Sequence, residues 1–232
     1  MLYHFYEMNH AAVAPWRTAL EAGRAYWDNA SNPFAQTVFG RSAAASLHLF
    51  ERLTRRYAKP EFGISETFVG KRQVAIHQEV VWQKPFCNLI HFRKDDDAGV
   101  KKQEKLLIVA PMSGHYATLL RNTVEAMLPS HDVYVTDWAD ARNVPLGSGT
   151  FDLDDYTDYV INMLHHLGER AHVMAVCQPS VPVMAAVSLM SEREDALVPK
   201  TMILMGGPID TRRNPTAVNN LAQEKGVEWF RK

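Results

Sequence analysis

From Leu106 onward the chain alternates short apolar runs with segments of helical spacing, and this alternation limits the fold more than any other feature. The apolar runs, which have strand character, cover residues 106–110, 132–136, 172–176 and 201–205. The segments between them, which have helical character, cover residues 116–128, 153–167 and 180–190. Strands that alternate with helices predict βαβ units and a parallel sheet, with functional loops at the carboxyl ends of the strands.

The chain before this alternation divides into two further parts. Residues 1 to about 58 place apolar residues at helical spacing and are rich in aromatic side chains. These aromatics predict either packing on the following domain or a face for a hydrophobic partner. The runs 73–82 and 87–92 predict two strands of a hairpin that turns near Lys84 and Pro85.

We therefore expect two domains. The first is a helical, aromatic-rich N-terminal segment over residues 1–62, and the second is an α/β core over residues 63–232. The tail from Asn214 carries apolar residues at helical spacing, which indicates the start of a cap region.

Composition excludes several function classes. The 232 residues are 47% hydrophobic and carry a formal net charge of -1, which argues against a nucleic-acid binder that neutralises phosphates. Two cysteines, Cys87 and Cys177, do not form a disulfide scaffold, so a reducing cytoplasm is expected. The sequence has no signal-peptide pattern, and no apolar stretch approaches the length of about 20 residues that a transmembrane helix needs.

Cys177 lies where a strand is predicted to turn sharply into a helix, in the pattern A-x-C-x-P. A nucleophile elbow has the same organisation, because small neighbours allow the crowded turn that exposes a nucleophile. The helix N-terminus then favours the thiolate. Pro179 would lie in the first helical turn, where backbone N–H groups have no partner within the helix, so the N–H that proline lacks costs nothing. A lone cysteine after an apolar run is also typical of a buried core position, and the sequence leaves that alternative open.

An elbow of this kind needs two backbone N–H groups as an oxyanion hole. The residue after the nucleophile, Gln178, supplies the first. The loop after the strand 106–110 supplies the second, which makes Met112 or Ser113 the candidate. Gly114 either lets this loop approach a substrate or serves only as a turn glycine.

Further candidates at this sheet edge are Asp137, Trp138 and His115. Trp138 is a candidate for shaping an acyl pocket, whereas local capping is the simpler prediction for Asp137. A triad also needs a histidine, which follows the nucleophile in this kind of fold. All ten histidines precede Cys177, so His115 is either an in-chain base or a positioning residue, and we expect the true base beyond Lys232.

The sequence resembles the intracellular polyhydroxyalkanoate (polyhydroxybutyrate) depolymerases. The resemblance rests on the elbow AVCQPS, the segments LLIVAPMSGHYATLLR and DVYVTDWADARNVP, and the aromatic helical N-terminus. It implies an α/β-hydrolase-type, mostly parallel sheet that is incomplete at its C-terminal side, with a helical N-terminal segment, over the N-terminal part of such an enzyme.

The resemblance also implies an activity and a partner. Cys177 is implied as the nucleophile of an ester hydrolase that acts on stored polyester, without cofactor or metal. The implied partner is polyhydroxyalkanoate polymer or the surface of its storage granules in the cytoplasm. The matching Asp and His of the triad have no counterpart in this chain, which we therefore expect to be inactive alone. We also expect it to form homo-oligomers, because the apolar strand 201–205 would lack the neighbouring strands that cover its edge.

Two alternatives stay open. Polyester synthases also use an elbow cysteine, in a G-x-C-x-G setting, although Pro179 and the flanking residues favour hydrolysis over such an acyltransferase. A non-catalytic granule-binding protein, which uses the aromatic N-terminal segment to hold polymer, is the second alternative.

Overall fold

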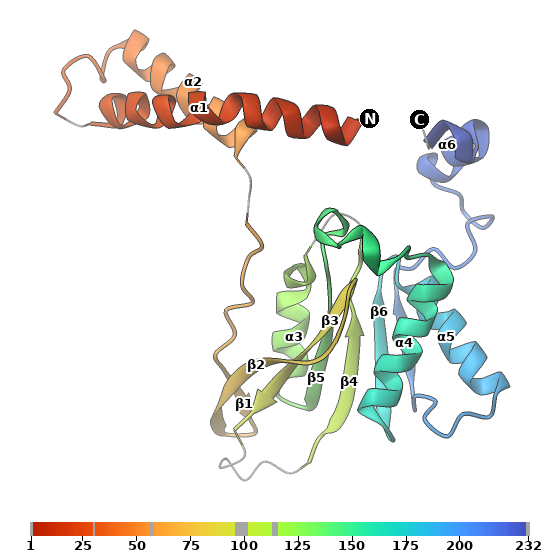
Figure 1. The fold of residues 1–232 in the computed structure, drawn as a ribbon. Helices are drawn as coiled ribbons and strands as arrows, with labels where there is room; N and C mark the ends of the chain where they lie inside the picture. Colours follow the sequence, from red (N-terminus) through yellow and green to blue (C-terminus); the bar gives the residue numbers. More distant parts are fainter. Residues whose placement is uncertain (1, 30, 56–57, 96–101, 113–115, 231–232) are drawn as a thin grey trace. The chain divides into compact units, whose positions relative to one another are not determined.

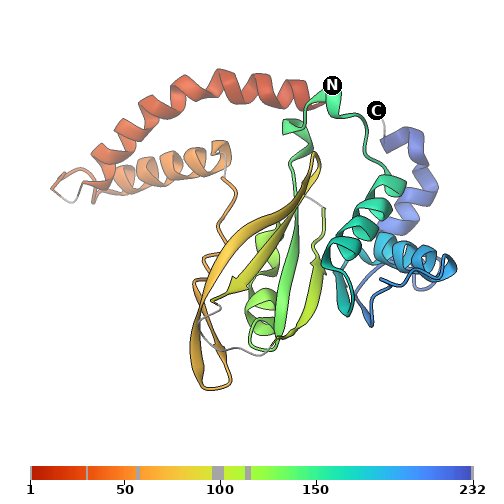
Figure 2. The ribbon, with the colours of Figure 1, turned by 60° about the horizontal axis from the view of Figure 1, so that its bottom comes forward.

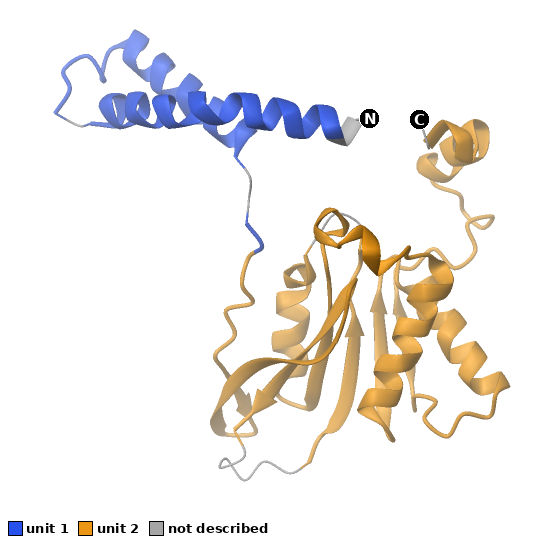
Figure 3. Cartoon of the chain, in the orientation of Figure 1, with its two compact units in different colours: residues 1–59 blue, residues 60–232 orange. Residues whose placement is uncertain are grey.

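The computed structural model describes residues 2–29, 31–55, 58–95, 102–112 and 116–230. The chain divides into two compact units, residues 1–59 and residues 60–232 (Figure 3). No helix among the described residues combines the length and the apolar character needed to cross a membrane.

Unit 1 is a hairpin of two helices, α1 (Leu2–Asp28) and α2 (Val38–Thr54). The helix α1 continues through Pro15. The turn between the helices is tight, because a Cβ on Gly40 would lie 2.1 Å from the carbonyl oxygen of Phe34. Thr37 caps α2 by accepting the N–H of Gly40 at 3.0 Å.

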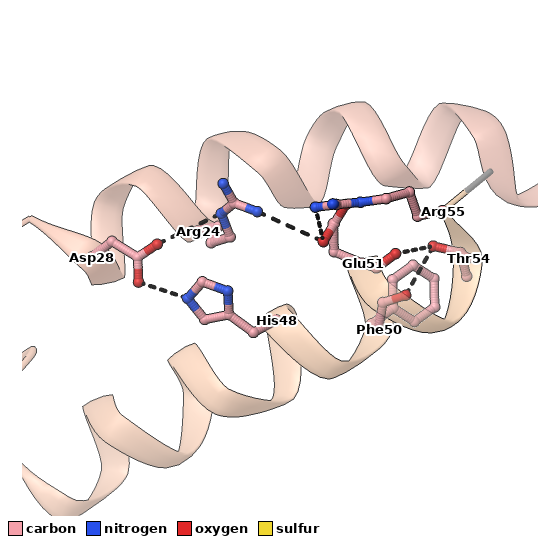
Figure 4. Close-up of polar contacts among 7 residues, drawn as sticks. All are labelled: Arg24, Asp28, His48, Phe50, Glu51, Thr54 and Arg55. Atoms are coloured by element: carbon pink, nitrogen blue, oxygen red, sulfur yellow. Dashed lines mark hydrogen bonds and ion pairs between the residues drawn. The ribbon is translucent and has the colours of Figure 1, made fainter. Parts of the chain in front are cut away.

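Polar contacts join the two helices along one side of the hairpin (Figure 4). Asp28 on α1 contacts Arg24 at 3.5 Å and His48 on α2 at 3.0 Å. Glu51 on α2 pairs with Arg24 and Arg55, and the hydrogen bond from Arg55 holds the pKa of the Glu51 carboxyl below its usual range. Solvent-screened pairs of this kind contribute little to stability.

Much of the apolar surface of the hairpin stays exposed. The large exposed side chains of unit 1 are Phe5, Tyr6, Met8, Trp16, Tyr26, Phe34, Val38, Phe39, Leu49 and Leu53. Trp27 is half-buried and packs edge-on against Tyr26 and Phe39. Two helices alone cannot bury a full apolar face, so the aromatics predicted from the sequence lie on the surface of this unit.

Unit 2 is built on a seven-stranded sheet with the order β1-β2-β3-β5-β4-β6-β7 (Figure 1). The strands are β1 (Glu66–Val69), β2 (Arg72–Lys84), β3 (Cys87–Lys94), β4 (Glu104–Val109), β5 (His131–Trp138), β6 (Ala171–Val176) and β7 (Met202–Met205). The strands β5, β4, β6 and β7 are parallel, whereas β1, β2 and β3 pair antiparallel, as does β3 with β5. This arrangement confirms the α/β-hydrolase-type fold and the predicted hairpin of β2 and β3.

Helices cover both faces of the sheet (Figure 1 and Figure 2). One face packs against η2 (Ala117–Leu120) and α3 (Arg121–Met127), and the other packs against α4 (Leu153–Leu167) and α5 (Ser180–Glu192). Short 3-10 turns, η3 (Ala141–Asn143) and η4 (Leu146–Ser148), lead into α4. The chain continues through α6 (Ala217–Lys225) and α7 (Val227–Phe230), whose residues are not buried.

Two predicted boundaries were wrong. The loop expected to begin at Asp137 begins later, because β5 continues to Trp138 and its last residues pair with Asn88 and Cys87 of β3. The helix expected over 116–128 is split into η2 and α3.

Candidate active site

Cys177 occupies the turn between β6 and α5, and its backbone has a φ of 68°. This left-handed conformation is costly for a residue with a Cβ and recurs where a side chain must be held at a sharp turn. The turn is fixed by two hydrogen bonds: the Cys177 N–H donates to Met205 at 2.7 Å, and its carbonyl accepts from Ser180 at 3.1 Å. The thiol is exposed, so the buried-core alternative does not describe Cys177.

The other cysteine provides a contrast. Cys87 begins β3, is 1% exposed and lies in the core cluster beneath α4 and α5. Of the two thiols, only Cys177 is accessible to a reagent in water.

Close packing against the loop after β7 also fixes the turn at Cys177. Gly207 is the second residue after β7, and a Cβ on it would lie 2.1 Å from Ser180 and 3.0 Å from the Cys177 carbonyl oxygen. Ser180 is fully buried at the first position of α5, and its hydroxyl has no hydrogen-bond partner among the described residues. Only glycine therefore leaves room for the loop after β7 to pass the turn.

The register of the sheet brings Met112 beside Gln178. Val109 of β4 pairs with Ala175 of β6, and Met112 and Gln178 each lie three residues beyond that pair. The Met112 N–H donates to Oε1 of Gln178 at 3.4 Å. The backbone N–H of Gln178 makes no hydrogen bond to a described residue. Two of the predicted oxyanion donors therefore lie on adjacent segments, while Ser113, Gly114 and His115 lie outside the described residues.

Buried contacts hold the end of β4. The Ala110 N–H donates to Oγ1 of Thr136 at 2.9 Å, and its carbonyl accepts from the indole N–H of Trp138 at 2.8 Å. Trp138 is 9% exposed and packs against aromatic side chains of α4 and the segment before it, Phe151, Tyr156 and Tyr159. Trp138 thus anchors the segment that leads to Met112.

Asp137 is a buried carboxyl at the same end of β5, 7% exposed. Because successive side chains of a strand point to opposite faces, Asp137 faces away from the aromatic cluster of Trp138. The sequence predicted local capping for Asp137, but it lies inside the strand and pairs with Asn88.

The described histidines of unit 2 lie away from Cys177. They stand near the amino ends of the parallel strands or on elements that reach that edge: His77, His91, His131, His165, His166 and His172. His172, for example, contacts Thr201 at 2.7 Å at the start of β6 and β7. The described residues therefore do not assemble a nucleophile–histidine pair, and they contain no group of three or more ligands placed to hold a metal ion.

Residues 206–232 match the family model described as PHB de-polymerase C-terminus. This match confirms the resemblance to polyhydroxybutyrate depolymerases within the segment that follows β7 and contains α6 and α7. The curated proteins contain no significant match.

Several solved structures are similar to part of the chain. An N-formylmaleamic acid deformylase from Pseudomonas putida S16 is 18% identical with a TM-score of 0.40, over 55% of this chain and 46% of its own. A fungal esterase from Rhizomucor miehei is 11% identical with a TM-score of 0.44, over 69% and 51%. A thermostable esterase from Pseudomonas putida ECU1011 is 12% identical with a TM-score of 0.42, over 89% and 60%. The chain thus spans about half the length of these proteins.

Proposed function

We propose that this chain carries the nucleophile half of a thiol-dependent carboxylic-ester hydrolase that acts on polyhydroxyalkanoate. The observation that carries the proposal is Cys177, whose exposed thiol stands at a turn with a φ of 68° between β6 and α5. A strained strand-to-helix turn that exposes a nucleophile is the organisation of the nucleophile elbow.

The proposed chemistry is acyl transfer to sulfur. The thiolate of Cys177 attacks the ester carbonyl carbon, and the carbonyl electron pair moves onto oxygen. The N–H groups of Gln178 and Met112 are the donors we assign to that oxyanion, a contribution of about a hundred- to a thousandfold per donor. Collapse of the intermediate breaks the ester C–O bond, the leaving oxygen departs with the bonding electron pair as an alkoxide or phenolate, and the acyl group remains on sulfur as a thioester. An alkoxide then takes a proton from water to give the alcohol.

Release of the acyl group requires water and a general base, which is worth about a hundred- to ten-thousandfold. The described histidines near Cys177 in sequence, such as His172, lie at the amino ends of the parallel strands, whereas Cys177 follows the carboxyl end of β6. No described histidine lies beside Cys177, and His115 is outside the described residues. We propose that the chain acylates but does not turn over on its own.

The substrate class is supported by the match of residues 206–232 to the polyhydroxybutyrate depolymerase C-terminal model. We extend this to stored polymer as the substrate, and to a cytoplasmic protein at the granule surface. The exposed aromatic side chains of unit 1, among them Trp16 and Phe39, are suited to an apolar polymer surface.

A burst-kinetics assay tests the proposal. Purified chain mixed with excess p-nitrophenyl butyrate should release a burst of about one p-nitrophenolate per molecule. Cys177→Ala should abolish the burst, and Cys177→Ser should retain a reduced one, because a hydroxyl depends more on a base. A full burst from Cys177→Ala would place the nucleophile elsewhere.

Two other functions are separated by further measurements. An acyltransferase of the synthase type would lengthen polymer from a hydroxyacyl thioester, whereas a hydrolase would release hydroxy acid. A granule-binding protein is favoured by the exposed aromatics of unit 1 and would co-sediment with polymer equally well as wild type and as Cys177→Ala.

A further inference from the structure

The side chain of Gln178 has a role that the elbow does not require of it. An elbow uses only the backbone N–H of the residue after the nucleophile. Here the side-chain amide of Gln178 turns toward β4, and its Oε1 accepts the N–H of Met112 at 3.4 Å. One residue therefore offers an oxyanion donor through its backbone and occupies the other donor through its side chain.

We propose that the Gln178 side-chain amide is a displaceable cap on the Met112 N–H, standing in for the carbonyl oxygen of the ester. The proposal rests on the proposed function, since it assigns Met112 and Gln178 to the same oxyanion hole. An amide oxygen and an ester oxygen are both neutral carbonyl acceptors, so the same N–H can serve either one.

The position of Met112 explains why a cap is needed. A backbone N–H that is removed from water costs free energy when it has no acceptor. Met112 is half-buried and packs against the core cluster that contains Trp138. The Gln178 oxygen satisfies the N–H of Met112 while no ester is present.

The length of the contact explains why the cap can be displaced. Most N–H···O bonds measure 2.7–3.2 Å between heavy atoms. The separation of 3.4 Å between Met112 N and Gln178 Oε1 lies beyond this range. An incoming ester oxygen that gains a shorter bond to the Met112 N–H, and a second bond from the Gln178 N–H, would displace the amide.

The backbone geometry lets the side chain move without disturbing the elbow. The turn is held by main-chain bonds, including Cys177 N–H to Met205 and Ser180 N–H to the Cys177 carbonyl. The Gln178 carbonyl accepts from Val181 at 3.3 Å. Rotation of the Gln178 side chain breaks none of these bonds.

The cap makes opposite predictions for two variants. Gln178→Met keeps the length of the side chain but removes the competing oxygen, so acylation of Cys177 by ester should accelerate about two- to tenfold. Gln178→Glu replaces the amide with a carboxylate, which is a stronger acceptor and repels an oxyanion, so acylation should fall at least about tenfold.

The experiment measures two rates on the intact chain. The first is the burst rate with p-nitrophenyl butyrate, and the second is the rate at which iodoacetamide alkylates Cys177. Alkylation displaces iodide at a saturated carbon and makes no oxyanion. Dividing the burst rate by the alkylation rate therefore gives a ratio in which any change in the thiolate fraction cancels. For Gln178→Glu the ratio should rise again as the pH is lowered and the new carboxylate is protonated.

The outcomes separate the cap from the proposed function. A higher ratio for Gln178→Met together with a lower, pH-dependent ratio for Gln178→Glu supports the cap. A ratio for Gln178→Met that is unchanged or lower overturns it, including the case in which Gln178 only holds the Met112 loop in place. A burst that persists in Cys177→Ala overturns the proposed function instead, whatever the Gln178 variants do.

Discussion

At the scale of single residues, Cys177 combines an unfavourable backbone conformation with an accessible side chain. A residue with a Cβ in the left-handed region costs roughly 1–2 kcal/mol relative to its ordinary conformations. The φ of 68° at Cys177 is held by the bonds to Met205 and Ser180 rather than by local preference. The turn therefore costs stability in order to present the thiol.

This cost can be measured by substitution. Cys177→Gly should raise the free energy of unfolding by about 1 kcal/mol, because glycine adopts positive φ without steric penalty. Cys177→Ala retains the Cβ and should bring no such gain. Urea unfolding of the three proteins checks this, and equal stability of the Gly and Ala variants would contradict it.

The two thiols should differ in reactivity. Cys177 is exposed in the turn between β6 and α5, whereas Cys87 is buried in the core. We expect a limiting amount of iodoacetamide to modify Cys177 at least about tenfold more than Cys87. Peptide mapping of the folded protein measures both sites, and preferential labelling of Cys87 would refute the elbow assignment.

At the scale of elements, the loop after β7 and the start of α5 depend on one glycine. Gly207→Ala places a methyl group 2.1 Å from Ser180, so either the loop or α5 must shift. We expect a loss of about 1–3 kcal/mol in the free energy of unfolding and a slower burst, because the Cys177 carbonyl lies beside the new atom.

A matched control exists in the same unit. A Cβ on Gly147, in η4, meets nothing within 4 Å, so Gly147→Ala should leave both stability and burst within experimental error. Gly207→Ala with wild-type thermal stability would show that the loop after β7 yields easily.

A second element-scale feature is a polar cluster that joins three strands. His91 on β3 contacts Asp132 on β5 at 2.7 Å and Glu79 on β2 at 3.2 Å, and its ring stacks on Tyr134 at 4.2 Å. Burial raises the pKa of the Asp132 carboxyl, but hydrogen bonds from His91 and Tyr134 and the charges of His91 and Lys94 outweigh it. The net pKa of Asp132 is lowered.

The lowered pKa makes this cluster a source of acid sensitivity. Its stabilisation is complete above the unfolded pKa of Asp132, near 3.8, and is lost as the pH falls through the lower folded value. Asp132→Asn should therefore lower the free energy of unfolding by about 1 kcal/mol at pH 7, with the difference shrinking as the pH falls below the unfolded pKa of Asp132 and through its lower folded pKa.

The control for this titration is Asp158→Asn, on the exposed side of α4. Its free energy of unfolding at pH 7 should stay within experimental error of the wild type. An Asp132→Asn difference that stays constant down to pH 2 would mean that the carboxylate charge does not stabilise the fold.

At the scale of the whole molecule, the sequence predicts the helices and strands whose signals are local and misses those that depend on pairing between strands. The bounds of α4 were confirmed at Leu153 and Leu167, because Asp152 caps the helix and Gly168 ends it. The four-residue strand β1 was missed because so short an edge strand has no clear alternation. The end of β5 was misplaced because Asp137 is typical of turns until β3 pairs with it.

The candidate site, like the fold, could be predicted from the sequence only in part. The small and apolar residues around Cys177 point to a turn, but the contact of Gln178 with Met112 depends on the register of β4 and β6. No local pattern records a register between segments more than 60 residues apart.

The purified chain as a whole should acylate without turning over. We expect a burst of about one equivalent, followed by a steady rate at least about a hundredfold below it, because the described histidines of unit 2 lie away from Cys177. Stopped-flow release of p-nitrophenolate measures both phases. Multiple turnover that depends on Cys177 would indicate a base inside this chain.

The separation of these histidines from the thiol also bears on how the protein can be handled. A maleimide probe attached to the exposed thiol of Cys177 would lie at the carboxyl ends of the parallel strands. His172 lies at the amino end of β6, where it contacts Thr201. A label on the thiol would therefore leave contacts of this kind, at the opposite ends of the strands, undisturbed.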